Sequence, residues 1–94
     1  MSRLKFAWDE TKAKSNLRKH NVSFDEARSV FFDENAQDGY DQEHSLAEDR
    51  FIMVGLSEQS RVLVLHHCHR NDEIRIISAR KATNKEIQYY KEGT

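Results

Sequence analysis

The sequence contains few of the residues that cross-link, kink or loosen a chain: one cysteine, no proline and three glycines. Because Cys68 is alone, no internal disulfide can form, which is typical of a protein in a reducing compartment. Glycine is too scarce for a P-loop, a dinucleotide fingerprint or a nucleophile elbow, and the chain carries none of these motifs. The same scarcity leaves no linker, repeat or low-complexity segment.

Long hydrophobic runs are also absent. No apolar stretch approaches the ~20 residues that cross a membrane, so we expect no membrane partner. The first residues, Met1–Lys5, are not followed by a hydrophobic signal core, and we therefore expect a cytoplasmic protein. Ninety-four residues predict one domain, residues 1–94, with a single core that buries about 60–65% of the unfolded surface.

The net charge of −1 argues by itself against a nucleic-acid binder, but the charges lie in blocks. Residues 1–20 hold six basic and two acidic side chains, and residues 61–85 hold the same numbers. Residues 33–49 hold seven acidic side chains and no lysine or arginine. Such blocks can form a basic face and an acidic face on one molecule, although ordinary solvated surface is the alternative.

The first half of the chain predicts a strand followed by two helices. Alternating apolar residues predict a strand over residues 4–8. Asp9 and Asn21 suit the two ends of the first helix, as an N-cap and as the left-handed residue that ends it. A capping box in Ser23–Glu26 opens the second helix, which ends near residues 33–35.

The second half predicts a meander of strands and a final helix. Three strands cover residues 50–56, 62–67 and 73–80, and a short strand over residues 37–40 precedes them. A capping box opens a last helix over residues 83–92. The order β-α-α-β-β-β-(β)-α predicts an α+β fold, in which helices pack on one face of a small antiparallel sheet.

The last predicted strand carries two arginines out of a hydrophobic run. Arginine is rarely buried unpaired, and its planar fork is well shaped to hold a phosphate, so Arg75 and Arg80 are candidates for phosphate binding. They differ in parity, and a regular strand would point them to opposite faces. Both can serve one site if Arg80 lies past the strand end, beside Lys81 and a helix N-terminus that favours anions. The alternative is that Arg75 pairs with Glu73 or Asp72 on an exposed face.

His44 lies in an acidic loop. Neighbouring carboxylates favour the charged form of an imidazole, which suits general acid or base work near neutral pH. A solvated loop histidine is the alternative. Glu48 and Arg50 are candidates of the same kind, and Arg50 begins a strand that could aim it at the same edge as Arg75.

The run His66-His67-Cys68-His69 is the one metal-like cluster in the sequence. By strand period His67 and His69 share one face, and two such imidazoles can bind zinc. A structural zinc site needs four donors, however, and no second pair of cysteines exists. We therefore expect no metal, but a strand end with exposed imidazoles in which Cys68 fills apolar space.

The first predicted helix has a basic exposed side. Lys12, Lys14, Arg18 and Lys19 line it, and together they could contact a phosphate backbone. A solvated helix face is the ordinary interpretation of such a pattern.

Taken together, these residues resemble the BrnT family over nearly the whole chain, from Phe6 to Tyr90. The N-terminal half carries Phe6-x-Trp8-Asp9, Lys12, Asn16-Leu17-x-Lys19-His20-x-Val22-Ser23-Phe24, Glu26-Ala27 and Val30-Phe31. The C-terminal half carries His44, Glu48-x-Arg50, Gly55-x-Ser57 and Ile74-Arg75-Ile76-Ile77-Ser78-Ala79-Arg80. The combination is specific, whereas no single capping box or arginine would be.

The resemblance implies the toxin of a type II toxin–antitoxin system, with a RelE-like fold. Such a toxin cleaves RNA without a metal or other cofactor and stops translation. A BrnA-like antitoxin neutralises it in a complex expected to hold two copies of each protein. Operator DNA is then contacted only through that complex. The alternative is a non-catalytic subunit of a DNA-binding autorepressor complex, and a small metal protein built on His67 and His69 is a third hypothesis.

RNA cleavage through the 2′-hydroxyl needs a base, an acid and cations for the crowded phosphate. The residues that the resemblance points to are His44 and Glu73 for proton transfer and Arg50, Arg75 and Arg80 for the developing charge. Lys19 and Lys81 are the expected RNA contacts. The resemblance does not separate the acid from the base.

Overall fold

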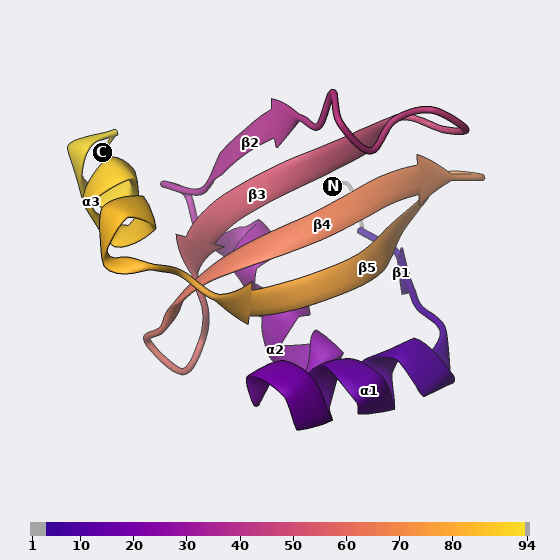
Figure 1. Cartoon of the computed structure of the whole chain (residues 1–94), viewed down its shortest axis with the longest axis horizontal. Helices are drawn as coiled ribbons and strands as arrows, with labels where there is room; N and C mark the ends of the chain where they lie inside the picture. The colour runs from indigo at the N-terminus through magenta and orange to yellow at the C-terminus, as the bar shows by residue number, and fades with distance from the viewer. Residues whose placement is uncertain (1–3, 94) are drawn as a thin grey trace.

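The computed structural model describes residues 4–93 and contains one five-stranded sheet and three α-helices (Figure 1). In chain order the elements are β1 (Phe6–Ala7), α1 (Glu10–His20), α2 (Phe24–Ser29), the 3-10 helix η1 (Val30–Phe32), β2 (Gln37–Tyr40), β3 (Arg50–Leu56), β4 (Val62–Arg70), β5 (Glu73–Lys81) and α3 (Asn84–Glu92). The strands follow the order β1-β5-β4-β3-β2. Only β1 is parallel to its neighbour, β5; the other pairs are antiparallel. The predicted α+β class and strand meander are therefore confirmed.

The ends of α1 and α3 are set by the residues that the sequence indicated. The Asp9 carboxylate accepts hydrogen bonds from two N–H groups in the first turn of α1, and Asn21 ends the helix with a φ of 56°. Thr83 and Glu86 form the predicted capping box at the start of α3. Within residues 4–93, no helix has the length and apolar character needed to span a membrane.

The start of α2 differs from its prediction in one respect. The Ser23 hydroxyl accepts a hydrogen bond from the Glu26 N–H at 3.0 Å, as expected. The Glu26 side chain does not complete a capping box, because it is 2% exposed and binds Arg61 and the Ser57 hydroxyl. The Arg61 hydrogen bond lowers the pKa of Glu26, with Ser57 adding to the effect and burial opposing it. Glu26 thereby ties α2 to the β3–β4 loop.

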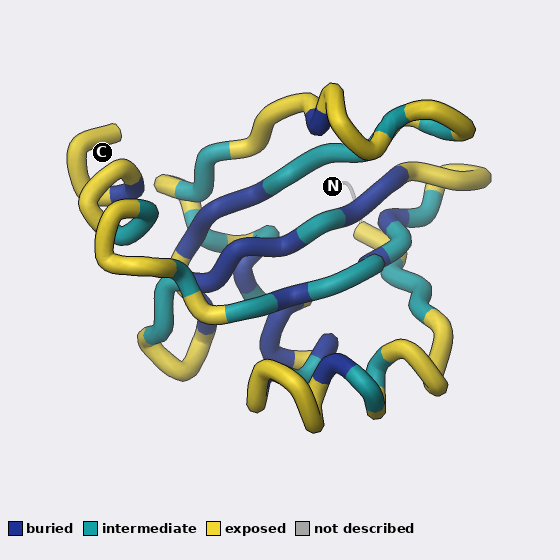
Figure 2. Tube along the Cα trace, in the orientation of Figure 1, coloured by how far each residue is buried: buried dark blue, intermediate teal, exposed yellow. Residues whose placement is uncertain are grey.

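The two faces of the sheet have different surroundings. Under α1 and α2 lies the main core, formed by Val22, Phe24, Ala27, Val30, Met53, Leu63, Leu65, Ile76 and Ala79. On the other face, Tyr90 of α3 packs with Val54 and Val64 at one end of the strands. The prediction of helices on one face thus holds for α1 and α2, whereas α3 packs against the opposite face. Figure 2 shows that the buried segments are concentrated in the central strands, while the segment after β2 is largely exposed.

A β-bulge in β5 changes the direction of its arginines. The pairing with β4 shifts register midway, and Ile77 is the extra residue. Arg75 lies opposite Cys68, and Arg80 lies opposite Val64. Because Cys68 and Val64 are four residues apart on β4, both arginines point to the face that α1 and α2 leave uncovered. The sequence-based expectation was that Arg75 and Arg80 share a face only if Arg80 lies past the end of the strand. That expectation was wrong, because Arg80 lies within β5 and the bulge turns it to the same face.

A side chain of α1 binds the outer edge of β5. Asn16 donates a hydrogen bond to the carbonyl of Ala79 at 2.8 Å and accepts one from its N–H at 3.1 Å. Its amide also donates to the carbonyl of Val22 at 2.9 Å. Asn16 is 7% exposed, and these bonds satisfy its buried polar atoms. It therefore fastens α1 to the sheet beyond the point where β1 ends.

Candidate active site on the uncovered sheet face

A cleft of about 510 Å³ lies on the sheet face opposite α1 and α2. Its floor is apolar and comes from β3 and β4. Its walls come from the segment that follows β2 and from β5 with the first turn of α3. The lining residues are Tyr40, Asp41, Gln42, Glu43, His44, Ile52, Val54, Val64, His66, Arg80 and Glu86. The cleft thus joins two histidines, three carboxylates and an arginine, a composition suited to acid–base chemistry on an anion.

Asp41 is held in place where β2 ends. Its side chain is 4% exposed, and its N–H donates to the Arg50 carbonyl at 2.8 Å. The Ser45 hydroxyl donates to the Asp41 carbonyl and accepts from the Arg50 N–H at 3.0 Å. These bonds fold residues 41–49 back onto the start of β3, which fixes the position of the Asp41 carboxylate.

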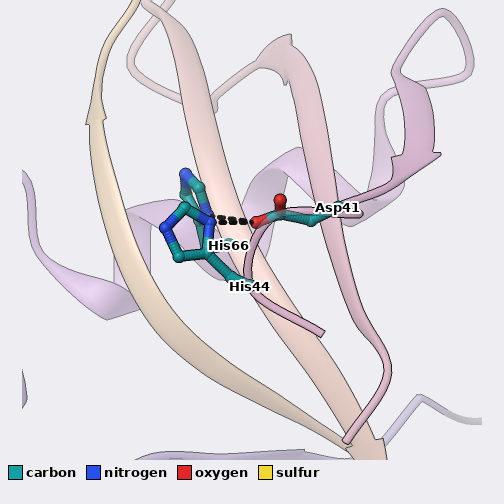
Figure 3. Close-up of side chains that lie close together, drawn as sticks. All are labelled: Asp41, His44 and His66. Carbon is teal, nitrogen blue, oxygen red and sulfur yellow. Dashed lines mark hydrogen bonds and ion pairs between the residues drawn. The ribbon is translucent and has the colours of Figure 1, made fainter. Parts of the chain in front are cut away.

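One oxygen of Asp41 faces two imidazoles (Figure 3). Asp41 Oδ2 lies 2.9 Å from His44 Nδ1 and 3.5 Å from His66 Nδ1. Burial acts to raise the pKa of Asp41, but the hydrogen bond and charge of His44 outweigh it and keep that pKa below its ordinary value. Burial lowers the pKa of His66 and outweighs the opposing effect of Asp41. The Nε2 atom of each ring is left for a substrate, because each Nδ1 faces the carboxylate.

Arg80 and Glu86 form a two-pronged ion pair at the other wall. Arg80 Nη1 and Nη2 lie 2.8 and 2.9 Å from the two Glu86 oxygens. This hydrogen bonding holds the pKa of Glu86 at about 2, although burial opposes it. A guanidinium has five N–H groups, so the pair with Glu86 leaves donors for a phosphate.

Arg50 and Arg75 lie further along the same face. Both are paired with Cys68, one from β3 and one from β5, so each is a diagonal neighbour of His66. Among the described residues Arg50 Nε is buried without a hydrogen-bond partner, and Arg75 makes no ion pair. The alternative in which Arg75 pairs with Glu73 or Asp72 is therefore not observed.

Three of the expected site residues lie away from the cleft. Glu73 is seven positions from Arg80 on β5, roughly 23 Å at about 3.3 Å per residue. Lys19 is exposed on α1, on the helix-covered side of the sheet. Lys81 lies opposite the core residue Leu63 and so points to that same side. Of the predicted set, the cleft contains His44 and Arg80.

Sequence reasoning missed Asp41 and His66 as partners of His44. His66 lies two positions from both Val64 and Cys68 on β4, so the three residues share one face of the strand, and that face is the uncovered one. Asp41 is the first residue after a predicted strand, which was the only available signal. Neither observation shows that the two side chains meet, because the fold-back of residues 41–49 produces that contact.

The histidine run is not an exposed strand end. β4 continues to Arg70, and His67 is 1% exposed with its ring packed against Phe31 and Phe51. Its Nε2 lies 3.1 Å from an Asp38 oxygen. The prediction of exposed imidazoles was therefore wrong for His67. Cys68 is 1% exposed, as a filler of apolar space should be, and burial raises the pKa of its thiol.

Comparisons with known proteins agree with this fold. A family model described as the ribonuclease toxin BrnT of a type II toxin–antitoxin system matches residues 8–86. The crystal structure of the Brucella abortus ribonuclease toxin BrnT is similar in fold, with a TM-score of 0.67 and 22% sequence identity. The similarity covers 87% of this chain and 100% of the Brucella chain. No curated protein sequence gives a match. The chain belongs to the BrnT family of ribonuclease toxins of type II toxin–antitoxin systems.

Proposed function

We propose that this toxin is an endoribonuclease that cleaves RNA in the cleft on the uncovered sheet face, without a metal ion, and so inhibits translation. The observation that supports this proposal best is the pair of imidazoles that share one oxygen of Asp41. They lie in the same cleft as Arg80. Two imidazoles beside a cation are the groups that cleavage through the 2′-hydroxyl requires.

The proposed reaction uses the free Nε2 atoms of His44 and His66. One imidazole accepts the proton of the 2′-hydroxyl, whose oxygen attacks the adjacent phosphorus. The bond between phosphorus and the 5′-oxygen breaks, and the other imidazole donates a proton to that oxygen. The products are a 2′,3′-cyclic phosphate and a free 5′-hydroxyl. Asp41 orients both rings and stabilises whichever of them is protonated.

The arginines have a separate role in this proposal. Arg80 holds the non-bridging oxygens of the reacting phosphate with the donors that Glu86 does not use. Arg50 and Arg75 hold the backbone on the other side of His66, which orients the strand along the cleft.

Lys19 and Lys81 would contact RNA outside the cleft. Lys19 lies beside Ser78 at the outer edge of β5, where a strand that leaves the cleft across this edge would pass. Lys81 lies at the end of the same strand. Both contacts would add affinity that depends on salt and not on sequence. In this proposal Glu73 has no part in proton transfer.

We further propose that the toxin acts in the cytoplasm and is neutralised there by a BrnA-like antitoxin. Membership in a type II family supports a protein antitoxin as the partner. The complex would hold two copies of each protein and contact operator DNA through the antitoxin.

The test is cleavage of a defined RNA by purified protein in the presence of EDTA. We expect fragments with 2′,3′-cyclic phosphate and 5′-hydroxyl ends, and a rate that falls by about 10²–10⁴-fold in His66→Ala or His44→Ala. His69→Ala is the matched control, since its exposed ring lies outside the cleft lining. If folded wild-type protein leaves RNA intact but its antitoxin complex binds DNA, the chain is a non-catalytic subunit.

A further inference from the structure

We propose that Asp41, His44 and His66 form a binding site for Zn²⁺, and that the bound ion inhibits RNA cleavage. The inhibition rests on the proposed function, whereas the binding rests on the three side chains alone. Among the residues that the structure describes, these three form the one group of histidines, cysteines and carboxylates close enough to hold a metal. Their ligand atoms all lie within 4.8 Å of one another.

Two of the three separations among these groups fit zinc, and the third, between the two imidazole nitrogens, is within 4.8 Å. Ligands about 2.0–2.1 Å from a tetrahedral zinc ion lie about 3.3–3.4 Å from each other. The separations from Asp41 Oδ2 to His44 Nδ1 and His66 Nδ1 are 2.9 and 3.5 Å, which bracket that value (Figure 3). Two imidazoles and one carboxylate suit zinc better than Mg²⁺ or Ca²⁺, which prefer oxygen ligands.

Two of the three ligands are already fixed. His66 lies in the interior of β4, and the hydrogen bonds that fold residues 41–49 onto β3 hold Asp41. His44 is on the exposed segment, with a side chain that is 57% exposed, so small movements can complete the coordination. The cleft opens to solvent above these ligands and leaves a fourth position for water, as in zinc sites with three protein ligands.

The charges of the cleft also accept a divalent cation. Arg80 is the arginine of the lining, and Glu86 already neutralises it. Asp41 supplies one negative charge to the ion, and Glu43 lines the same cleft. No lysine is among the lining residues, which are all described. Among the residues that line the cleft, carboxylates therefore outnumber the single arginine, while Arg50 and Arg75 lie further along the same face.

Bound zinc would prevent the proposed proton transfers. An imidazole must be neutral to bind a metal. With zinc on Nδ1, the single ring proton stays on Nε2, which then cannot accept the proton of the 2′-hydroxyl and is a weaker acid than an imidazolium. The ion would also take the Asp41 oxygen that orients both rings. We therefore expect zinc and acid–base cleavage to exclude each other at this site.

The binding half is tested with the full chain after removal of metals by a chelator. Titration with Zn²⁺ should give one ion per chain by calorimetry, and Co²⁺ in its place should give the visible spectrum of a nitrogen- and oxygen-bound ion. His66→Ala, His44→Ala and Asp41→Asn should each weaken binding by at least about tenfold. His69→Ala and His20→Ala are controls that should leave affinity unchanged. Equal affinity in wild type and His66→Ala, or loss of the single site in His69→Ala, would overturn the proposal.

The inhibition half is tested by adding Zn²⁺ to the RNA cleavage assay. The rate should fall as one equivalent binds, and EDTA should restore it; Mg²⁺ at the same concentration should have no such effect. Full cleavage at full occupancy, or a faster rate with zinc, would exclude inhibition. If RNA stays intact in every condition, the proposed function fails, while the calorimetry and the Co²⁺ spectrum still decide the metal site.

Discussion

Arg75 and Arg80 point from β5 to the same sheet face although five positions separate them, because Ile77 is an extra residue between them. They lie opposite Cys68 and Val64, on either side of the row that contains His66. Two positive charges on β5 therefore flank the His66 imidazole of the neighbouring strand β4. A bulge that redirects a side chain next to a candidate active site is a common use of this irregularity.

Replacement of Arg75 by alanine should weaken RNA binding without changing stability. Arg75 makes no ion pair with any described residue, so unfolding in urea should shift by no more than about 0.5 kcal/mol. Loss of one phosphate contact should lower the slope of log affinity against log salt by about one unit. Arg28→Ala, on α2, is the matched control and should keep the slope. An unchanged slope in Arg75→Ala would show that Arg75 does not contact the RNA backbone.

The Arg80–Glu86 pair should make stability depend on pH in the acid range. The pKa of Glu86 is about 2 in the folded protein against an ordinary value of 4.5, so its contribution is complete above pH 4.5 and disappears as pH falls toward 2. Partial exposure reduces the gain, and we expect Glu86→Gln to cost about 1–2 kcal/mol at neutral pH.

Urea unfolding of Glu86→Gln and wild type at several pH values checks this expectation. The difference between them should shrink as pH falls from 5 to 2. Glutamine still accepts the capping hydrogen bond of α3, and Glu34→Gln serves as a surface control. A difference that stays constant down to pH 2 would show that the ion pair is not its cause.

His67 and His69 should respond differently to the same substitution. His67 is 1% exposed and packs against Phe31 and Phe51, so His67→Ala should destabilise the fold by about 2–4 kcal/mol. His69 is exposed, and His69→Ala should change stability by less than about 0.5 kcal/mol. Thermal unfolding of the two variants compares them directly. Equal stabilities would mean that the His67 ring contributes nothing to packing.

Substitution of Glu26, which lies outside the cleft, should strongly lower the free energy of unfolding. It is buried beside Arg61 and Ser57, and loss of its charge would leave a guanidinium and a hydroxyl without their partner. We expect Glu26→Ala to destabilise the protein by about 2–4 kcal/mol, a value below that of a fully buried pair because Arg61 is partly exposed. Denaturant unfolding measures the loss, and Asp25→Ala on the exposed side of α2 provides the comparison.

The parts of the fold that could be predicted from sequence are those decided by neighbouring residues. Asp9, Asn21 and the Thr83–Glu86 capping box mark helix ends through contacts within one turn, and each prediction was confirmed. Glu26 fits the same local pattern, but a distant arginine takes its side chain instead. A local pattern does not show whether a side chain binds its helix end or a partner that is distant in the sequence.

The candidate site was harder to predict because it depends on register and on contacts across the chain. The alternation of faces along β5 is interrupted at Ile77, and no sequence pattern indicates a bulge there. The meeting of Asp41 with His66 depends on hydrogen bonds between the segment after β2 and the start of β3. His44 was found as a single residue, and its partners become visible only once the chain is folded.

Asn16 has a consequence for self-association. A strand paired only along part of its length leaves backbone N–H and C=O groups that can recruit another chain into the sheet. β1 covers β5 only at Ile74 and Arg75, so Ala79 lies on the open part of that edge. The carboxamide of Asn16 has the same donor and acceptor as a peptide group and occupies both positions at Ala79, so that pair of groups is not available to a second copy. One side chain thus blocks at this residue the edge-to-edge pairing that would otherwise lead toward aggregation.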